Sequence, residues 1–330
     1  MKSKEPNIKE LGLKDQPVFL FVRHNLGIML VLLLLVALLS ALSPVFLTPN
    51  NLLTVLKQIS HNMCLALGMT LVIILGGIDL SVGALVAMIG TVTVGLIVNQ
   101  GVPIFAGILI GLILGILCGA LNGGFVAFFK FPAFIVTLSM MNIARGVAYI
   151  YCGGKTTRIM DERFVKIGTG SLGLVPIPVI YMLVMIVIFS ILLNKTKFGT
   201  YIYAIGGNRE AARLSGVPIK ITEIAVFTIA GFMASFAGIV LAARMYSGQP
   251  SVGDGHELNA IAACVLGGIS MSGGVGRIGG TVMGVLVMGV INNGLNLLNV
   301  STYWQYVAKG AIILIAVMVD WMKQRSKVNV

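Results

Sequence analysis

The sequence predicts an all-α integral membrane protein of about ten transmembrane helices. Of its 330 residues, 57% are hydrophobic and only 10% are charged, whereas soluble domains carry about 25% charged residues. The mean hydropathy is +0.99. The chain also holds 41 glycines, and close packing at small residues is typical of transmembrane bundles. These observations argue against a large soluble helical protein and make lipid the solvent for much of the surface.

Ten apolar segments are candidate spans, because about 20 apolar residues cross a bilayer as a helix. They are Leu26–Ser43, Ser60–Leu75, Leu80–Val98, Val102–Phe128, Pro132–Tyr151, Pro176–Leu193, Glu223–Ala243, Leu258–Ile269, Ile278–Leu298 and Tyr303–Asp320. Two of them are weak. Leu258–Ile269 is short, which indicates a broken or re-entrant helix. Only a Gly-Gly-Ile-Asp break separates the second and third segments, so one kinked element is the alternative there.

Positive charge orients these spans. With the N-terminus inside, the inside segments hold 15 Lys/Arg residues and the outside segments hold 5. Cytoplasmic loops carry the excess of positive charge, so both termini are predicted to be cytoplasmic, which requires an even number of spans. We therefore expect one transmembrane domain over residues 26–321, between a cytoplasmic arm at 1–25 and a cytoplasmic tail at 322–330. The polar arm does not resemble a cleaved signal peptide.

No catalytic, cofactor or metal pattern is evident, and a non-catalytic chain is expected. Gly153 to Thr157 resembles the end of a phosphate-binding loop, but the pattern needs a glycine where Tyr149 stands. The four cysteines have no ligand spacing, and the three histidines are scattered along the sequence. If such a chain moves a solute across the membrane, the energy must come from a partner or from an ion gradient. Asp79 is the strongest acidic candidate at membrane depth, so an ion-coupled secondary transporter stays open.

A polar segment, Lys195–Thr222, interrupts the apolar pattern and carries five Lys/Arg residues. Within it, Glu210 is followed by two alanines and, after three further residues, by Gly216. Asn208 is placed to cap a short helix, which Gly216 ends and Pro218 prevents from resuming. The plain alternative is a solvated loop with a chance pattern.

Several longer motifs accompany this segment. They are Gly76 to Gly83 (GGIDLSVG), Tyr201 to Asn208 (YIYAIGGN), Ala212 to Gly216 (ARLSG), Gln249-Pro250, Glu257 to Ala263 (ELNAIAA), Leu266-Gly267-Gly268 and Asn292 to Leu297 (NNGLNL). Together with the Glu-Ala-Ala loop they resemble the monosaccharide branch of ABC-importer permeases, the ribose, arabinose, galactose and xylose group. The resemblance covers nearly the whole chain and is closest to ribose permeases.

The resemblance implies a division of labour. Two permease copies form the path, an extracytoplasmic sugar-binding protein docks outside, and ATPase subunits that hold ATP and magnesium bind inside. The chain itself would bind no cofactor and lie in the bacterial plasma membrane. The Glu-Ala-Ala loop would be a short cytoplasmic helix that docks into a groove on the ATPase. Its candidate coupling residues are Asn208, Arg209, Glu210, Ala211, Ala212, Arg213 and Gly216.

An internal repeat is visible, and it suggests a path. Asn122 and Asn292 are 170 residues apart, each in a span, and Arg145 and Lys309 are 164 apart. The predicted spans of each pair run in opposite directions, as inverted repeats require. The two basic residues are expected to snorkel to the interface or to pair with carboxylates.

Polar side chains at membrane depth are the candidates for the path. An unpaired amide costs about 2–7 kcal/mol there, so Asn122, Asn292 and Asn293 should face the bundle interior. Either they hold helices together or they touch sugar hydroxyls in passage. Asp79 is expected to cap the helix that starts near Leu80, a role that Ser81 would share.

Overall fold

The fold is a helical bundle with two very short strand pairs. The computed structural model describes the backbone of residues 17–328 and the side chains of residues 25–322. The helices are α1 (Pro17–Leu42), α2 (Pro49–Leu75), α3 (Val82–Asn99), α4 (Ile104–Phe129), α5 (Ala133–Cys152), α6 (Glu162–Thr169), α7 (Ile177–Lys195), α8 (Lys197–Gly207), α9 (Arg209–Leu214), α10 (Ile219–Arg244), α11 (His256–Leu266), α12 (Ile278–Leu297) and α13 (Thr302–Val328). The strands are β1 (Thr157–Arg158), β2 (Ser171–Leu172), β3 (Val175–Pro176) and β4 (Ser247–Gly248), and β1 pairs with β4 and β2 with β3, both antiparallel.

The structure confirms nine of the ten predicted spans as long helices. Within residues 17–328, nine helices are long and apolar enough to cross a membrane. The tenth, α11, has 11 residues, or about 16 Å of helix, which is roughly half of a 30 Å hydrocarbon core. The broken helix expected at Leu258–Ile269 is therefore present. The second and third segments are two separate helices rather than one kinked element.

Two boundaries differ from the predicted ones. α2 begins at Pro49 rather than Ser60, because a proline is tolerated in the first turn, where its missing N–H has no partner to lose. Lys57, counted as a loop charge, therefore lies on this helix. α1 begins at Pro17, so residues 17–25 of the predicted N-terminal arm are helical. Residues 1–16 of that arm and residues 329–330 of the predicted tail lie outside the described residues.

The core lies in the middle helices, α2, α3, α10, α11 and α12, whose buried residues form one continuous cluster. The outer helices α1, α4, α5, α7 and α13 expose large apolar side chains. In water such a surface would be unfavourable; in a bilayer it contacts hydrocarbon. The exposed apolar faces thus agree with the membrane assignment.

A stripe of glycines brings α4 against α10. Gly107, Gly111, Gly115, Gly119 and Gly123 recur every four residues on α4 and are all buried. A Cβ atom added at the last three of these would meet α10, including its backbone. Small residues at this spacing let two helix backbones approach closely in a membrane. The glycine richness of the sequence therefore has a packing cause here.

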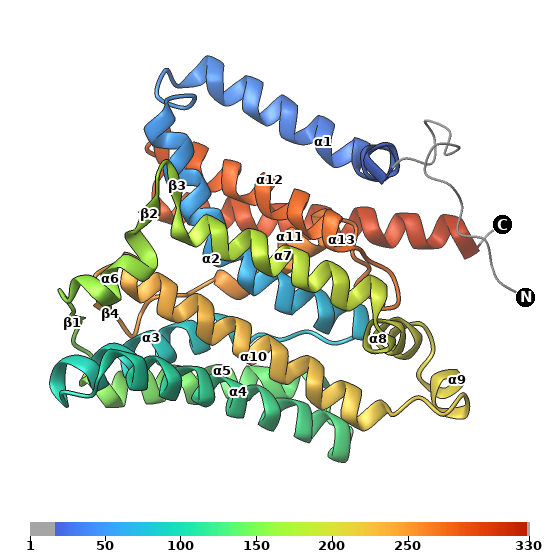
Figure 1. The fold of residues 1–330 in the computed structure, drawn as a ribbon. Coiled ribbons are helices and arrows are strands. Elements are labelled where there is room, and N and C mark those ends of the chain that lie inside the picture. The colour runs from blue at the N-terminus through green and yellow to red at the C-terminus, as the bar shows by residue number, and fades with distance from the viewer. Residues whose placement is uncertain (1–16, 329–330) are drawn as a thin grey trace, which may run out of the picture.

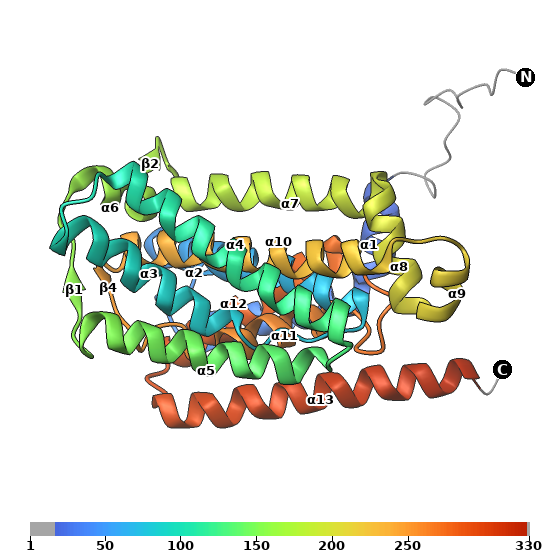
Figure 2. The same ribbon diagram turned by 90° about the horizontal axis from the view of Figure 1, so that it is seen from below.

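The bundle has two distinct ends (Figure 1). One end carries α8 and α9, together with the start of α1 and the end of α13; the other carries α6 and all four strands. We call them the α8–α9 end and the strand end. The charge count assigns the α8–α9 end to the cytoplasm. Figure 2 shows α13 lying along one side of the bundle, where it packs on α11.

The inverted repeat predicted from the asparagine and basic pairs is present in the helix order. Helices α2, α3, α4 and α5 correspond to α10, α11, α12 and α13: α2 contacts α10, α11 and α12, while α10 contacts α2, α3 and α4. In the same way α3 packs on α5, and α11 packs on α13. Asn122 and Asn292 lie on the corresponding helices α4 and α12, and Arg145 and Lys309 lie on α5 and α13.

Candidate coupling surface and central polar junction

The polar segment Lys195–Thr222 folds into two short helices, of which only the second, α9, was expected from the capping residues. The Thr196 Oγ1 atom accepts from the Gly199 N–H at 3.2 Å at the start of α8. Asn208 Oδ1 accepts from the Ala211 N–H at 2.9 Å at the start of α9. Gly216 adopts φ +78° after α9, a left-handed conformation that favours glycine. Asn208 therefore fixes the start of α9, and Gly216 allows the chain to turn away after its end.

The outer face of α9 is exposed, with one apolar tip. Glu210 and Arg213 form an ion pair on this face, with Nε–Oε2 at 2.9 Å. Leu214 is 78% exposed, whereas Ala212 is buried against the rest of the chain. A short helix with a charged rim and an exposed leucine suits a groove on another protein, because apolar area drives association and charge sets orientation.

Arg209, expected at the rim of a partner contact, turns instead toward its own chain. Both of its terminal nitrogens bond the carboxylate of Glu223 on α10, with Nη2–Oε2 at 3.2 Å. The Glu223 side chain is 3% exposed and the Arg209 side chain 43%. Sequence reasoning missed Glu223, although an acid at the edge of a span was a signal that could have found it. The pair ties α9 to the first turns of α10.

Helix α8 contacts two parts of the chain: the end of α2, and the loop that follows α11. Tyr203 Oη donates to the Gly276 carbonyl at 2.8 Å, and the Gly274 N–H donates to the Ile74 carbonyl at 2.8 Å. A Cβ atom at Gly206 would meet the backbone of Ile74 and Gly274, so only glycine permits this approach. Through these contacts α8 lies against the end of α2 and against the loop that follows α11.

The first break in the bundle holds a buried polar network. α2 ends at Leu75, the next residue, Gly76, adopts φ +94°, and the chain is not helical again until Val82. Asp79 Oδ1 accepts from the Ser81 N–H at 2.9 Å and from Ser81 Oγ at 2.5 Å. Because α3 starts at Val82 rather than near Leu80, Asp79 forms a turn ahead of the helix and does not cap it, and Ser81, at the N-cap position, makes no side-chain cap bond.

Helices α4 and α5 close this network from the side. Asn122 Nδ2 donates to Ser81 Oγ at 3.1 Å. Thr137 Oγ1 donates to the Ile78 carbonyl and accepts from the Leu80 N–H, each at 3.1 Å. All of these groups except the backbone of Ile78 and Leu80 belong to fully buried residues. Asn122 therefore links α4 to the first break through its Nδ2 atom, while its Oδ1 atom is buried without a hydrogen-bond partner.

The second break, between α10 and α11, is held by Arg145. Its Nη1 atom donates to the carbonyls of Pro250 and Val252, both at 2.7 Å. The expectation that Arg145 snorkels or pairs with a carboxylate is wrong, because the non-helical segment beside α5 offers unpaired carbonyls. A Cβ atom at Gly83 would meet the Gly253 carbonyl and the Glu257 carboxylate. The first turns of α3 and α11 therefore meet inside the bundle, and we call this meeting point the central junction.

The two remaining asparagine candidates, Asn292 and Asn293, differ in their hydrogen bonding. Two hydrogen bonds join the side-chain amides of Asn293 on α12 and Asn51 on α2. Asn293 Nδ2 donates to Asn51 Oδ1 at 2.8 Å, and Asn51 Nδ2 donates to Asn293 Oδ1 at 3.0 Å. Asn293 is therefore committed to helix packing. Asn292 is partly buried, and its Oδ1 atom is buried without a hydrogen-bond partner.

Two histidines that are far apart in the sequence meet in the core. The rings of His61 on α2 and His256 on α11 lie 5.5 Å apart between centroids. Scattered positions in the sequence gave no sign of this contact, because it depends on how α11 packs on α2. Among the described residues no group of three or more His, Cys, Asp or Glu side chains is placed to hold a metal ion.

Comparisons with known proteins agree with this architecture. The sequence pattern of one family, described as the branched-chain amino acid transport system permease component, matches residues 51–317. The ribose import permease protein RbsC of Bacillus subtilis is 46% identical over 304 residues, covering 92% of this chain and 94% of that protein. RbsC of Escherichia coli K12 is 46% identical, with 90% and 93% covered. The L-arabinose permease AraH of the same strain is 45% identical, with 86% of each chain covered.

No solved structure matches the chain. The family match spans more than half of the sequence, and it includes nearly all of α2, the helices from α3 to α12 with α8 and α9 among them, and both breaks. The relatives extend over nearly the full length of the chain. The chain therefore belongs to the family of transport-system permease components.

Proposed function

We propose that this chain is the membrane-spanning subunit of an ATP-driven importer of a monosaccharide, with ribose as the first candidate. The observation that carries the proposal is the 46% identity to ribose import permeases over 92% of this chain. An arabinose permease is nearly as similar, at 45%, so the class of sugar is better supported than the sugar itself. The exposed helix α9 supports the ATP-driven class.

The proposed assembly has three kinds of partner. An ATPase subunit binds α8 and α9 and holds ATP and magnesium, while this chain binds no cofactor and catalyses no reaction. A sugar-binding protein docks at the strand end, and a second copy of the chain completes the path. The complex lies in the bacterial plasma membrane, with the α8–α9 end in the cytoplasm, where the excess of Lys and Arg places it.

The contacts of α8 and α9 suggest how ATPase movement reaches the path. Arg209 ties α9 to α10 through Glu223, and α8 lies against the end of α2 at Ile74. The loop that follows α11 is hydrogen-bonded to the end of α2 through Gly274 and to α8 through Gly276. Each of these three elements leads to one of the two breaks, and the breaks meet at the central junction. A tilt of α8 and α9 would therefore act at once on α3 and α11, the helices that follow the two breaks, which is a rigid-body route between two arrangements.

Two features favour the ion-coupled alternative. Broken helices that meet inside the membrane and a buried acid such as Asp79 are both found in secondary transporters. In this chain, however, one oxygen of Asp79 is already bonded to Ser81, and the exposed α9 would have no role. We therefore place this reading second.

The deciding experiment is uptake by the reconstituted chain. The permease is co-purified with its ATPase subunit and binding protein and inserted into liposomes, and uptake of labelled ribose, arabinose, xylose and galactose is measured. ATP-dependent uptake with ribose ahead is the expected result. A hexose in the lead would overturn the sugar but not the class. Uptake driven by an ion gradient with no ATPase present would overturn the class.

A further inference from the structure

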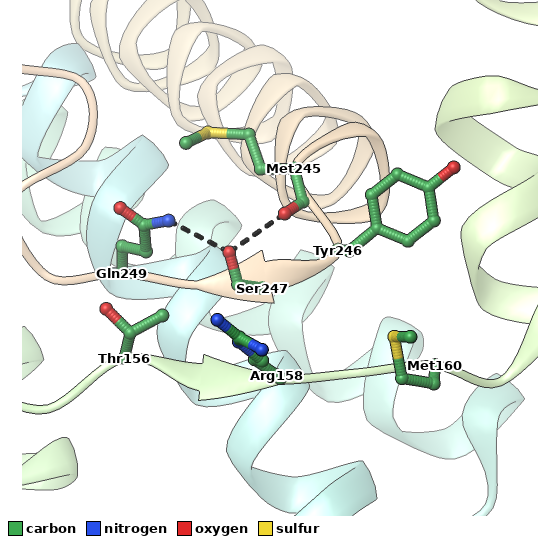
Figure 3. Close-up of a pocket in the computed structure, with 7 residues that line it drawn as sticks. All are labelled: Thr156, Arg158, Met160, Met245, Tyr246, Ser247 and Gln249. Atoms are coloured by element: carbon green, nitrogen blue, oxygen red, sulfur yellow. Dashed lines mark hydrogen bonds between the residues drawn. The ribbon is translucent and has the colours of Figure 1, made fainter.

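A polar depression opens at the strand end, where β1 and β4 pair (Figure 3). It has a volume of about 530 Å³, within the range of about 300–1,000 Å³ that small-molecule sites occupy. Its residues come from two distant segments: Thr156, Arg158 and Met160 from the loop after α5, and four more from the segment after α10. The short β1–β4 pairing brings the two segments together.

The lining is divided into a polar side and an apolar side. Thr156, Ser247 and Gln249 lie together near Arg158, with Gln249 Nε2 donating to Ser247 Oγ at 2.9 Å (Figure 3). Hydroxyl and amide groups both donate and accept, as sugar hydroxyls do, and the guanidinium adds donors. No carboxylate lines the depression. This set of groups matches a neutral polyhydroxyl ligand.

Three larger side chains, Met160, Met245 and Tyr246, form the apolar part of the lining. Methionine adapts to irregular shapes, and a tyrosine ring presents an apolar face with a polar tip. Tyr246 adopts φ +56°, a backbone conformation that costs a non-glycine residue free energy and is found preferentially at functional sites. A hydrogen bond from the Ile159 N–H to the Tyr246 carbonyl, at 3.0 Å, stabilises this backbone conformation.

The depression is continuous along the chain with the central junction. Gln249 is followed directly by the segment whose carbonyls bond Arg145. That segment leads within a few residues to Gly253, which lies against Gly83 at the start of α3. A ligand held between β1 and β4 would thus contact the same non-helical segment that leads to the central junction.

We propose that this depression is the first sugar-binding site of the permease, which receives the neutral monosaccharide when the binding protein releases it. The proposal rests on the proposed function and names a site for it. Thr156, Arg158, Ser247 and Gln249 bond the hydroxyls, and the apolar side chains cover the C–H face of the ring.

A protein-docking role fits the depression less well than it fits other parts of the strand end. The most exposed apolar side chain there is Leu174 on the β2–β3 hairpin, at 90%, whereas Met160 in the lining of the depression is 77% exposed. Protein contacts are centred on such projecting anchors. The depression, in contrast, contains a buried serine, Ser247, and has the volume of a small ligand.

The test uses the complete importer, with saturating binding protein and labelled sugars. Gln249→Ala and Arg158→Ala are compared with Gln100→Ala and Arg163→Ala, which remove the same groups from exposed positions outside the depression. We expect each depression variant to slow maximal ribose uptake about 2- to 10-fold, the effect of one lost hydrogen bond, and to alter the ratio of ribose to arabinose uptake. The controls should match the wild type. Affinity for the loaded binding protein is measured in parallel to report correct assembly.

Each outcome bears on one proposal. Slower uptake with an altered sugar ratio and unchanged binding-protein affinity supports the site. Equal slowing of all sugars with weakened binding-protein affinity would identify a docking surface and overturn the sugar site. Unchanged rates and ratios in both variants would also overturn it, with the proposed function intact. If Gln249→Ala does not assemble, the isosteric Gln249→Glu is used, and an unchanged sugar ratio in that variant counts against the site. If even the wild-type complex imports no sugar with ATP, the proposed function itself fails.

Discussion

Arg209→Ala tests the tie between α9 and α10 most sharply. The substitution leaves the Glu223 carboxylate buried without its partner. At the 3.2 Å separation of Nη2 and Oε2, the attraction of two unit charges is about 5 kcal/mol at an effective dielectric constant of about 20. Because the Arg209 side chain is 43% exposed, solvent screens part of this term. We expect a net loss of about 1–3 kcal/mol in the free energy of unfolding.

The assay combines stability with coupling in the reconstituted importer. Thermal unfolding of the purified complex reports the loss of stability, and sugar uptake per ATP hydrolysed reports coupling. Arg209→Ala should lower the unfolding temperature and reduce uptake more than ATP hydrolysis, because α9 can then move without α10. Arg209→Ala with Glu223→Gln should recover stability, since the lone buried charge is removed, but not coupling.

Arg213→Ala is the matched control. It removes an arginine from the exposed pair with Glu210 on the same helix, and such pairs contribute about 0–1 kcal/mol. We expect nearly unchanged stability. If Arg209→Ala leaves the unfolding temperature as little changed as Arg213→Ala does, the inference that the Arg209–Glu223 pair ties α9 to α10 is wrong.

Three further substitutions test the packing. Gly216→Ala should cost about 1–2 kcal/mol, because φ +78° is unfavourable for a residue with a Cβ atom; an unchanged unfolding temperature would show that α9 ends differently. Asn293→Leu should cost about 1–3 kcal/mol by leaving the buried Asn51 Oδ1 atom without its donor, and the addition of Asn51→Leu should restore part of the loss if the two side chains are hydrogen-bonded as described. Gly119→Val should cost about 1–3 kcal/mol or more by pushing α4 away from the α10 backbone, whereas Gly124→Ala, in open space on the same helix, should leave the unfolding temperature unchanged.

The spans, the inverted repeat and the α9 helix could all be predicted from the sequence, because each rests on local physics. Length and hydropathy decide whether a segment crosses the membrane. Asn208 and Gly216 act on the nearest turns of backbone, so the ends of α9 can be read directly. The repeat was visible because Asn122 and Asn292 retain the same residue type at corresponding positions of α4 and α12.

The contacts that organise the site could not be predicted, because they join residues that only the tertiary fold brings together. Arg145 finds its partners 105 and 107 residues away, and those partners are carbonyls, which every residue carries. Arg209 was assigned to an outside partner because nothing local shows that the loop turns α9 back onto Glu223. The depression between β1 and β4 likewise needs two segments that are distant in sequence.

The most direct test of the central account is photo-crosslinking in the assembled importer. A photoreactive amino acid replaces Leu214 at the exposed tip of α9, and a second variant carries it at Leu174 on the β2–β3 hairpin at the opposite end. The account predicts that the Leu214 variant crosslinks to the ATPase subunit and that the Leu174 variant does not. Crosslinking of the ATPase from position 174, or its absence from position 214 in a complex that imports sugar, would contradict it.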